Sequence, residues 1–192
     1  MDIGEIRIRL AGWVGDFVKH WEGGLGSLAG RMGLVVGLSR ENVVRGSGGP
    51  FGAGVFEMGT GRLVAVGVNM VEAVRCSSAH AEVVALSLAQ QGLGVYDLSE
   101  KGDFELVSST APCAMCLGAV EWSGVRRVVC GARGEDAEAV GFDEGSKPGD
   151  WAGALAGRGI EVVEDVMRAE AREVLQEYVD GGGVVYNPRR GG

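Results

Sequence analysis

Proline is scarce in this chain, with 4 among 192 residues, and no Gly-X-Y period runs through the sequence. A collagen-like protein needs both features, so that class is excluded. Glycine is nevertheless abundant, because 35 of 192 residues is about 18%, against a usual share of roughly 7%. The hydrophobic content of 46% is enough to build the core of one folded domain, and it argues against intrinsic disorder.

Positive charge is in deficit. The chain has 18 lysines and arginines against 26 aspartates and glutamates, which gives a formal net charge of −8. A molecule with this balance repels the phosphate backbone of nucleic acids and the surface of anionic membranes. The composition therefore favours a small neutral or cationic partner, with neither nucleic acid nor membrane bound.

The chain also lacks the signals of membrane insertion and secretion. Its longest uncharged stretch near the middle, residues 106–120, is too short to span a bilayer and contains three hydroxyl side chains and Pro112. The first five residues form neither a basic nor an apolar signal region, and no Asn-x-Ser/Thr acceptor occurs. We therefore expect a cytoplasmic protein.

Hydrophobic periodicity predicts one domain over residues 31–192, preceded by an N-terminal extension, residues 1–30, that packs on it. The predicted helices cover residues 31–45, 79–91, 113–122 and 165–180, and the predicted strands cover 51–57, 63–69, 104–108, 125–130 and 160–163. Ser77 and Ser78 are the expected N-cap of the second helix and Gly92 its C-cap. Residues 131–159 are expected to be mainly loop. A hairpin followed by alternating helices and strands predicts a three-layer α/β/α fold with a mixed central sheet.

Two short motifs about thirty residues apart carry the chemistry. The first is His80-Ala81-Glu82, and the second is Pro112-Cys113-Ala114-Met115-Cys116. One imidazole and two thiolates give zinc three protein ligands and leave its fourth position open, as in catalytic zinc sites. The pattern H-x-E followed by P-C-x-x-C is a known signature of zinc-dependent nucleobase deaminases. It predicts His80, Cys113 and Cys116 as the metal ligands.

Glu82 lies two residues from His80. Side chains at this spacing do not face each other on a regular helix, so the two residues are poor candidates to ligate the same ion. A carboxylate beside the metal can instead take a proton from water and pass it on, and this is the role that we assign to Glu82. Two alternatives are a structural zinc site with Cys76 or Cys130 as fourth ligand and a thioredoxin-like redox pair. The redox pair leaves the His-x-Glu motif unexplained.

Longer segments resemble the cytidine deaminase-like superfamily, and specifically its bacterial guanine deaminases, from about residue 30 to the C-terminus. The matching segments are Gly49-Pro50-Phe51, Asn69, Ser78-Ala79-His80-Ala81-Glu82, Glu121-Trp122-Ser123-Gly124-Val125, Gly141-Phe142-Asp143-Glu144-Gly145 and Val185-Tyr186-Asn187. The resemblance implies hydrolysis of guanine to xanthine and ammonia, with one Zn²⁺ per subunit. It also implies a homodimer in which the C-terminal segment, residues 181–192, closes the active site of its own subunit or, if the segments are exchanged, of the partner.

The resemblance also implies roles for individual residues. Glu144 would be a second proton carrier beside Glu82, because two carboxylates in different environments can divide acid and base tasks. Aromatic rings suit a planar base, and an amide that both donates and accepts suits a purine edge. The implied substrate contacts are Phe51, Asn69, Ala81, Phe142, Asp143 and Tyr186.

Other amino-heterocycles remain open as substrates, namely guanosine, cytosine and aminotriazines such as ammeline. A tRNA adenosine deaminase shares the zinc signature, but it would need a basic channel, and Arg189-Arg190 is the only obvious basic pair near the end of the chain. A non-catalytic zinc-binding scaffold is the alternative from another class. We expect Trp122 in the core and His20 in a surface or packing role.

Overall fold

The computed structural model describes residue 4 and residues 6–187, and these residues fold around one five-stranded mixed sheet. The strands lie in the order β2-β1-β3-β4-β5. Their bounds are Gly52–Glu57 for β1, Leu63–Val68 for β2, Phe104–Thr110 for β3, Arg127–Ala132 for β4 and Glu161–Val163 for β5. Residues 188–192, which include Arg189-Arg190 and the end of the predicted closing segment, lie outside the described part of the chain.

The predicted hairpin forms the first edge of the sheet. Strand β1 pairs antiparallel with both β2 and β3, while β3, β4 and β5 are parallel neighbours. Strands β2 and β3 therefore point the same way, and their carboxyl ends lie at one edge of the sheet. Segments that follow these strands are brought together there, which is the usual place for a site in an open α/β sheet.

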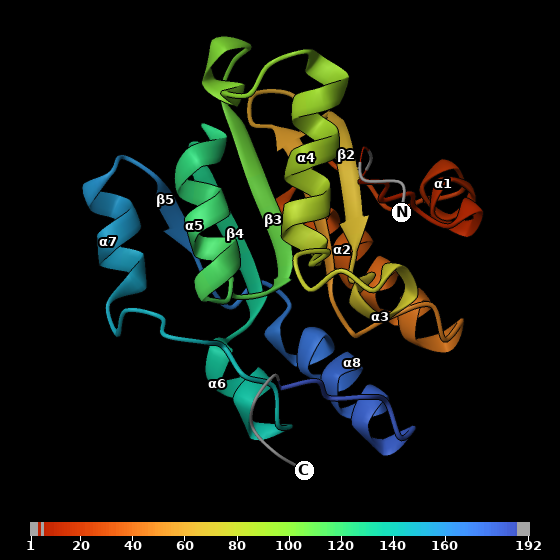
Figure 1. Cartoon of the computed structure of the whole chain (residues 1–192). Helices are drawn as coiled ribbons and strands as arrows, with labels where there is room; N and C mark the ends of the chain where they lie inside the picture. Colours follow the sequence, from red (N-terminus) through yellow and green to blue (C-terminus); the bar gives the residue numbers. More distant parts are fainter. Residues whose placement is uncertain (1–3, 5, 188–192) are drawn as a thin grey trace.

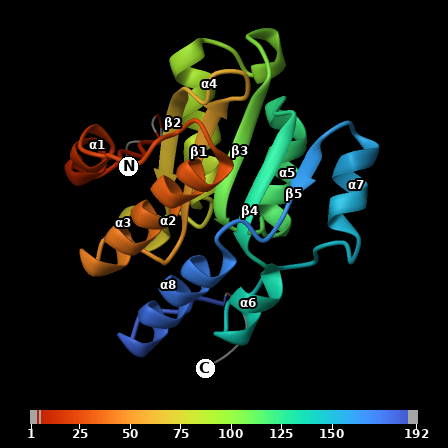
Figure 2. The ribbon, with the colours of Figure 1, turned by 180° about the vertical axis from the view of Figure 1, so that it is seen from behind.

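Helices cover both faces of the sheet (Figures 1 and 2). On one face, α2 (Leu28–Val44) packs on β1 and β3, and α8 (Arg168–Asp180) packs on β4. On the other face lie α4 (Ala81–Leu93) and α5 (Ala114–Ser123). The predicted three-layer α/β/α fold is confirmed. None of the helices in the described residues is long and apolar enough to cross a membrane.

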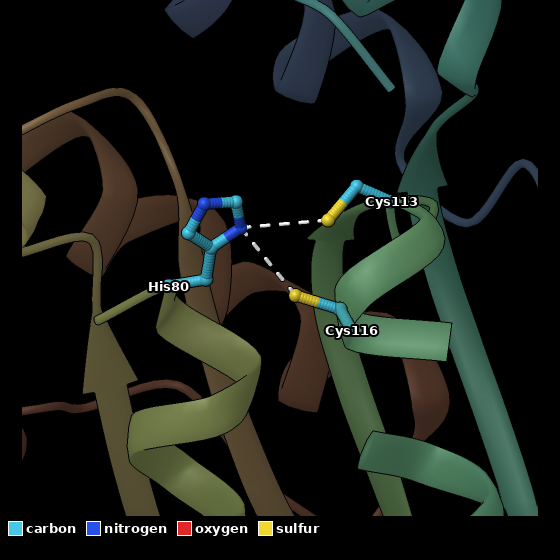
Figure 3. A group of neighbouring side chains, drawn as sticks. All are labelled: His80, Cys113 and Cys116. Carbon is cyan, nitrogen blue, oxygen red and sulfur yellow. Dashed lines mark hydrogen bonds between the residues drawn. The ribbon is translucent and has the colours of Figure 1, made fainter. Parts of the chain in front are cut away.

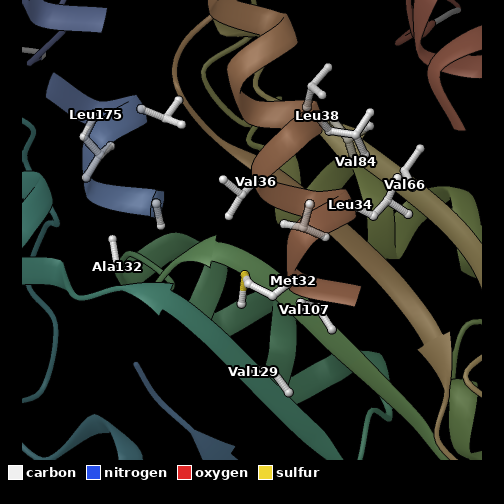
Figure 4. Packing of buried hydrophobic residues seen from close by; sticks show 14 of the residues in the cluster. Met32, Leu34, Val36, Leu38, Val66, Val84, Val107, Val129, Ala132 and Leu175 are labelled. Carbon is white, nitrogen blue, oxygen red and sulfur yellow. The ribbon is translucent and has the colours of Figure 1, made fainter. Parts of the chain in front are cut away.

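Strand side chains alternate between two buried clusters, as the two-residue period of a strand requires. Phe56, Val107 and Val129 point into the cluster under α2 and α8, which Figure 4 shows around Met32. The neighbouring residues Val55, Leu106 and Val128 point into the cluster under α4 and α5. Both faces of the central strands are therefore apolar, which explains their nearly continuous hydrophobic sequences.

Helix α4 does not begin and end where its sequence predicts. The prediction that Ser77 and Ser78 cap the helix is wrong, because the N-cap is His80, whose side chain makes no capping hydrogen bond. The C-cap is Gly94 in the left-handed conformation, with φ of 69°, and Gly92 lies inside the helix. The true N-cap leaves the imidazole of His80 free to face the next helix, α5.

The sequence pattern did not predict several short helices. The segment expected to be mainly loop contains α6 (Gly134–Ala139) and α7 (Trp151–Gly157), and α3 (Val71–Val74) follows β2. A short 3₁₀ helix, η1 (Leu98–Glu100), precedes β3. These elements span at most two turns, so they carry too few residues to show a helical period.

The N-terminal segment contains α1 (Gly12–Lys19), which packs on α2. A Cβ atom at Gly37 of α2 would lie 2.9 Å from the ring of Phe17, so the glycine makes room for this ring. Helix α2 begins at Leu28, where the side chain of Ser27 accepts a hydrogen bond from the backbone N–H of Gly30. The helix therefore starts before residue 31, the sequence-based boundary of the domain.

Gly67 sets the distance between β2 and α4. A Cβ atom at this position would lie 2.1 Å from the carbonyl oxygen of Ala81 and 2.7 Å from the nitrogen of Ala85, both backbone atoms. We expect Gly67→Ala to lower the free energy of unfolding by roughly 1–3 kcal/mol through overpacking. Gly92→Ala is the matched control, because nothing lies within 4 Å of its added Cβ, and it should stabilise the helix slightly. Chemical denaturation measures both, and equal stability of Gly67→Ala and the parent would contradict this packing.

Candidate metal centre and substrate cavity

Three candidate ligands converge from the starts of two helices on the same face of the sheet. His80 is the N-cap of α4, and Cys113 is the N-cap of α5, with Cys116 in the first turn of α5. Both caps have extended backbone, with φ of −71° and −69°. The free N–H groups and the dipole of a helix start stabilise negative charge, so this position favours the thiolate forms of the two cysteines.

The donor atoms have the spacing that a tetrahedral zinc ion requires. The Nδ1 atom of His80 lies 3.5 Å from each of the two sulfur atoms (Figure 3). Zinc–sulfur and zinc–nitrogen bonds of roughly 2.3 and 2.05 Å at a tetrahedral angle place nitrogen and sulfur about 3.6 Å apart. The three residues are the one group of metal-ligating side chains found among the described residues, and they fit a zinc ion.

Negative charge is crowded around this group of ligands. The hydrogen bond from the Cys116 thiol, aided by His80, lowers the pKa of Cys113 to about 4 despite its burial. Hydrogen bonding to that thiolate, together with burial, raises the pKa of Cys116. Burial lowers the pKa of His80, but the acidic neighbours, Cys113 first, outweigh it and raise the pKa overall. A divalent cation bound here offsets this crowding.

Glu82 is buried directly beside the ligands. The hydroxyl of Ser108 donates to its Oε1 atom at 3.3 Å, and the thiol of Cys116 donates to its Oε2 atom at 3.4 Å. Burial raises the pKa of this carboxyl, and the Cys113 thiolate raises it further. A carboxyl with a raised pKa next to a metal site holds a proton more readily than a free carboxyl, which suits a group that accepts and releases protons.

A small cavity opens in front of the candidate ligands. Its walls combine aromatic rings, an amide, carboxylates and the metal-site residues, and consist of Phe51, Asn69, His80, Glu82, Thr110, Ala111, Cys113, Phe142, Asp143, Glu144 and Tyr186. The structure thus brings predicted site residues from segments far apart in the sequence to one cavity, which Ala81 and Cys116 do not line.

Two aromatic rings and an amide form one side of the cavity. The rings of Phe51 and Phe142 meet edge to face, with centroids 4.9 Å apart. Asn69 directly follows β2, and its backbone oxygen accepts a hydrogen bond from the buried side chain of Asn42 at 2.9 Å. The same Asn42 amide donates to the backbone oxygen of Gly49 at 2.9 Å. Asn42 therefore ties together the two segments that carry Phe51 and Asn69.

The acidic loop after α6 is fixed to the start of α5. The backbone N–H of Ala114 donates to the carbonyl oxygen of Glu144 at 2.9 Å. Within the loop, the Oδ1 atom of Asp143 accepts from the backbone N–H of Gly145 at 2.9 Å. Glu144 as a whole residue is 8% exposed, and burial raises the pKa of its carboxyl to about 7. The structure therefore places a second titratable carboxyl in the wall of the cavity.

Tyr186 reaches the cavity from the C-terminal segment of the same chain. Its hydroxyl lies 2.9 Å from the Nε2 atom of His80, on the side of the ring away from the sulfur atoms. The segment is anchored nearby, because the side chain of Asn187 donates to the carbonyl oxygen of Gly141 at 2.8 Å. A partner on the second nitrogen orients a ligand histidine, so Tyr186 is placed to hold the imidazole toward the metal site.

The remaining sequence-based assignments have mixed outcomes. The side chain of Ala81 is fully buried in the core under α4 and does not line the cavity. The expectation that Trp122 is a core residue is wrong, because 81% of it is exposed. Cys76 and Cys130 lie outside the ligand group, so the closed four-ligand site receives no support. His20 is exposed, as expected.

Sequence reasoning also missed four residues around the site: Asn42, Ser108, Thr110 and Ala111. Ser108 and Thr110 lie in β3, where they look like ordinary strand residues, and Ala111 follows it. Asn42 lies in α2 directly after Arg40 and Glu41, and it is fully buried. A buried amide needs hydrogen-bond partners, but the polar residues before Asn42 in the sequence give no sign that it is buried.

Comparison with known proteins agrees with the geometry. Residues 31–132 match the family model described as the cytidine and deoxycytidylate deaminase zinc-binding region. The chain belongs to this family. It is a zinc-dependent hydrolytic deaminase, with His80, Cys113 and Cys116 placed as the zinc site.

One curated relative and two solved structures share much of the sequence of this deaminase. A guanine deaminase from Bacillus subtilis is 41% identical over 109 residues, which are 57% of this chain and 67% of the relative. A solved guanine deaminase from Nitrosomonas europaea is 46% identical, with a TM-score of 0.85, and the match covers 91% of this chain and 96% of the other. A solved mutant protein in complex with 8-azaguanine matches with the same TM-score and identity, over 91% and 97% of the two chains.

The zinc site of this deaminase predicts how single substitutions change metal content. Cys116→Ser removes one of three ligands, so we expect it to lower zinc affinity by more than the roughly 10–100-fold typical of changes around a ligand. Cys76→Ser is the matched control and should keep the parental zinc content, because Cys76 lies outside the ligand group. Elemental analysis after dialysis against a weak chelator measures both. Full zinc occupancy in a folded Cys116→Ser protein would show that the ligand set is wrong.

Proposed function

We propose that the protein hydrolyses guanine to xanthine and ammonia. The observation that carries this proposal is the pair of buried carboxyls, Glu82 and Glu144, that line one cavity together with the zinc ligands and an aromatic pair. The relatives support it, because two of them are guanine deaminases and a solved protein of 46% identity holds the guanine analogue 8-azaguanine.

The cavity walls suit a flat purine with polar edges. Phe51 and Phe142 offer apolar ring surface to the base, which binds a planar heterocycle without requiring charge. The Asn69 amide both donates and accepts, as the oxygen and N–H groups of guanine require. The carboxylate of Asp143 is fixed by its own loop through Gly145 and can accept from guanine N–H groups. These residues orient the base with its amino-bearing carbon toward the metal site.

A zinc ion held by His80, Cys113 and Cys116 would activate water for attack on this carbon. Glu82 accepts a proton from the attacking water and delivers it to the adjacent ring nitrogen. The hydroxyl of Ser108 donates to one of its carboxyl oxygens, which helps the carboxyl to keep one orientation during both transfers. Burial keeps the pKa of Glu82 raised, which lets the same group accept and release the proton.

Glu144 serves as the second proton carrier in this proposal. The second proton of the attacking water leaves the oxygen as the carbon becomes the carbonyl of xanthine, and Glu144 carries it to the amino group, which departs as ammonia. Because the pKa of Glu144 is about 7, both of its protonation states are populated at neutral pH. Glu82 and Glu144 lie in different environments, one hydrogen-bonded and one facing a lysine, so they can divide the two proton transfers.

An ammonia-release assay tests the function directly. We expect release from guanine by the purified zinc protein, and Glu82→Gln should lower kcat by roughly 10²–10⁴-fold while zinc content stays at the parental level. Glu100→Gln, an exposed glutamate in η1, is the control and should leave kcat unchanged. Near-parental turnover by a folded Glu82→Gln protein would refute the assigned role.

The same assay separates guanine from the other candidate substrates, with guanosine, cytosine, adenine, ammeline and a tRNA containing wobble adenosine run beside it. Faster turnover of any of these than of guanine would overturn the choice of substrate and leave the deaminase chemistry intact. Ammonia release from none of them would contradict the proposed function.

We also propose that the protein acts as a homodimer, with the C-terminal segment from residue 181 closing the active site. Two large aromatic residues, Tyr96 and Trp122, are 82% and 81% exposed and line the same surface hollow. Exposed aromatic surface of this kind is typical of a protein–protein contact.

The homodimer predicts a molar mass in solution of twice that of the 19.9 kDa chain. Trp122→Glu should lower this molar mass, because it places a charge in the exposed aromatic surface. Light scattering measures it, and a monomeric parent would refute the homodimer.

A further inference from the structure

Glu144 lies in a wall between two hollows of the molecule. One is the substrate cavity, and the other is a polar hollow between α6 and α7. The Oε2 atom of Glu144 is buried and has no hydrogen-bond partner among the described residues. A carboxyl in this position therefore needs some other interaction to hold it in one orientation.

Lys147, three residues along the same loop, faces that unpartnered oxygen. Its ammonium nitrogen lies 3.7 Å from Oε2 of Glu144, and the two side chains are only 12% and 10% exposed. A lysine is rarely this buried unless its charge is compensated. The backbone N–H of Lys147 donates to the carbonyl oxygen of Gly145 at 2.8 Å, which fixes the turn between the two charged side chains.

The aromatic ring of Trp151 supports the ammonium group from another side. The nitrogen of Lys147 lies 4.6 Å from the centroid of this ring, within the range of a cation–π interaction. Trp151 begins α7, and Gly134 begins α6. A Cβ atom at Gly134 would lie 3.3 Å from the lysine nitrogen and 3.5 Å from the Glu144 oxygen, so the start of α6 covers the pair closely.

We propose that Lys147, which packs on Trp151, is a positioning residue that fixes the orientation of the Glu144 carboxyl between the two hollows and stabilises its ionised form. This inference rests on the proposed function of Glu144 in proton transfer. Lys147 itself lies outside the zinc motifs and does not line the substrate cavity, so it acts only through Glu144.

The charged groups around Glu144 determine how Lys147 affects the pKa of this carboxyl. Burial is the main factor that raises the pKa of Glu144 to about 7, and Cys113, Glu82 and Glu138 raise it further. Lys147 opposes them and lowers this pKa. The second hollow also contains the charged residues Arg133, Glu135, Asp150 and Glu164. Removing the lysine charge leaves Glu144 with acidic neighbours and holds it protonated up to a higher pH.

Three variants test this role in the full-length zinc protein. Lys147→Met should lower kcat for guanine about tenfold at pH 7, with KM within about twofold, and move the pH inflection of Glu144 upward by about one unit. Lys147→Arg keeps the charge and should restore most of kcat and the inflection. Lys101→Met, an exposed lysine beyond η1, is the control and should match the parent.

Two further measurements decide between this role and a merely structural one. In a Glu144→Gln background, Lys147→Met should have no additional effect on kcat, and an additive loss would overturn the proposal. Titration of ¹³C-carboxyl-labelled glutamate by NMR, with the Glu144 signal identified by its loss in Glu144→Gln, should show a raised pKa in Lys147→Met. An unchanged titration in the folded, zinc-loaded variant would also overturn it.

The NMR titration needs no substrate, so it separates the two hypotheses. A parent protein that releases no ammonia from guanine, together with a raised Glu144 pKa in Lys147→Met, refutes the proposed function and supports the control of Glu144 by Lys147. Ammonia release by the parent with no change in Lys147→Met supports the function and refutes the positioning role.

Discussion

The structure depends on how it accommodates negative charge around a single imidazole. Cys113, Cys116, Glu82 and Glu144 all lie near His80, most of them buried, where their mutual repulsion is poorly screened. Two features make this arrangement tolerable. The thiolates lie at the start of α5, where the helix dipole favours them, and the donor spacing matches a zinc ion that would offset the charge. A zinc ion that offsets the repulsion between these acidic groups therefore also lowers the free-energy cost of burying them.

This convergence requires that α4 and α5 begin at the same edge of the sheet. Strands β2 and β3 point the same way although they are separated by β1, so the segments that follow them meet at one edge. Gly67 then lets α4 lie against β2 at backbone distance. On the opposite face of the sheet, Asn42 of α2 ties the segment before β1 to the segment after β2. Packing on both faces therefore determines where the candidate metal ligands and the cavity residues Phe51 and Asn69 lie.

The sequence was most informative where spacing has a direct chemical meaning. The His-x-Glu and Cys-x-x-Cys motifs predicted the metal ligands and Glu82, because coordination restricts residue type and spacing together. Strand positions followed from apolar runs of β-branched residues. The start of α4 was misplaced because Ser77-Ser78 resembles a better cap than His80, whose side chain faces the cysteines instead. Trp122 was misplaced because an aromatic residue in an apolar helix gives no sign of which way it faces. The Lys147–Glu144 pair depends on α6 and α7, which are too short to be read from periodicity.

The C-terminal segment adds a physical link between the cavity and the metal site. Val184 is held by the hydroxyl of Tyr178 in α8, and Asn187 is held to Gly141 at the start of the acidic loop. Between these two anchors, the hydroxyl of Tyr186 contacts His80. Phe142, Asp143 and Glu144 line the cavity directly after Gly141, so the C-terminal segment contacts both this loop and the imidazole of His80. A displacement of the C-terminal segment would therefore disturb the wall of the cavity and the orientation of the imidazole together.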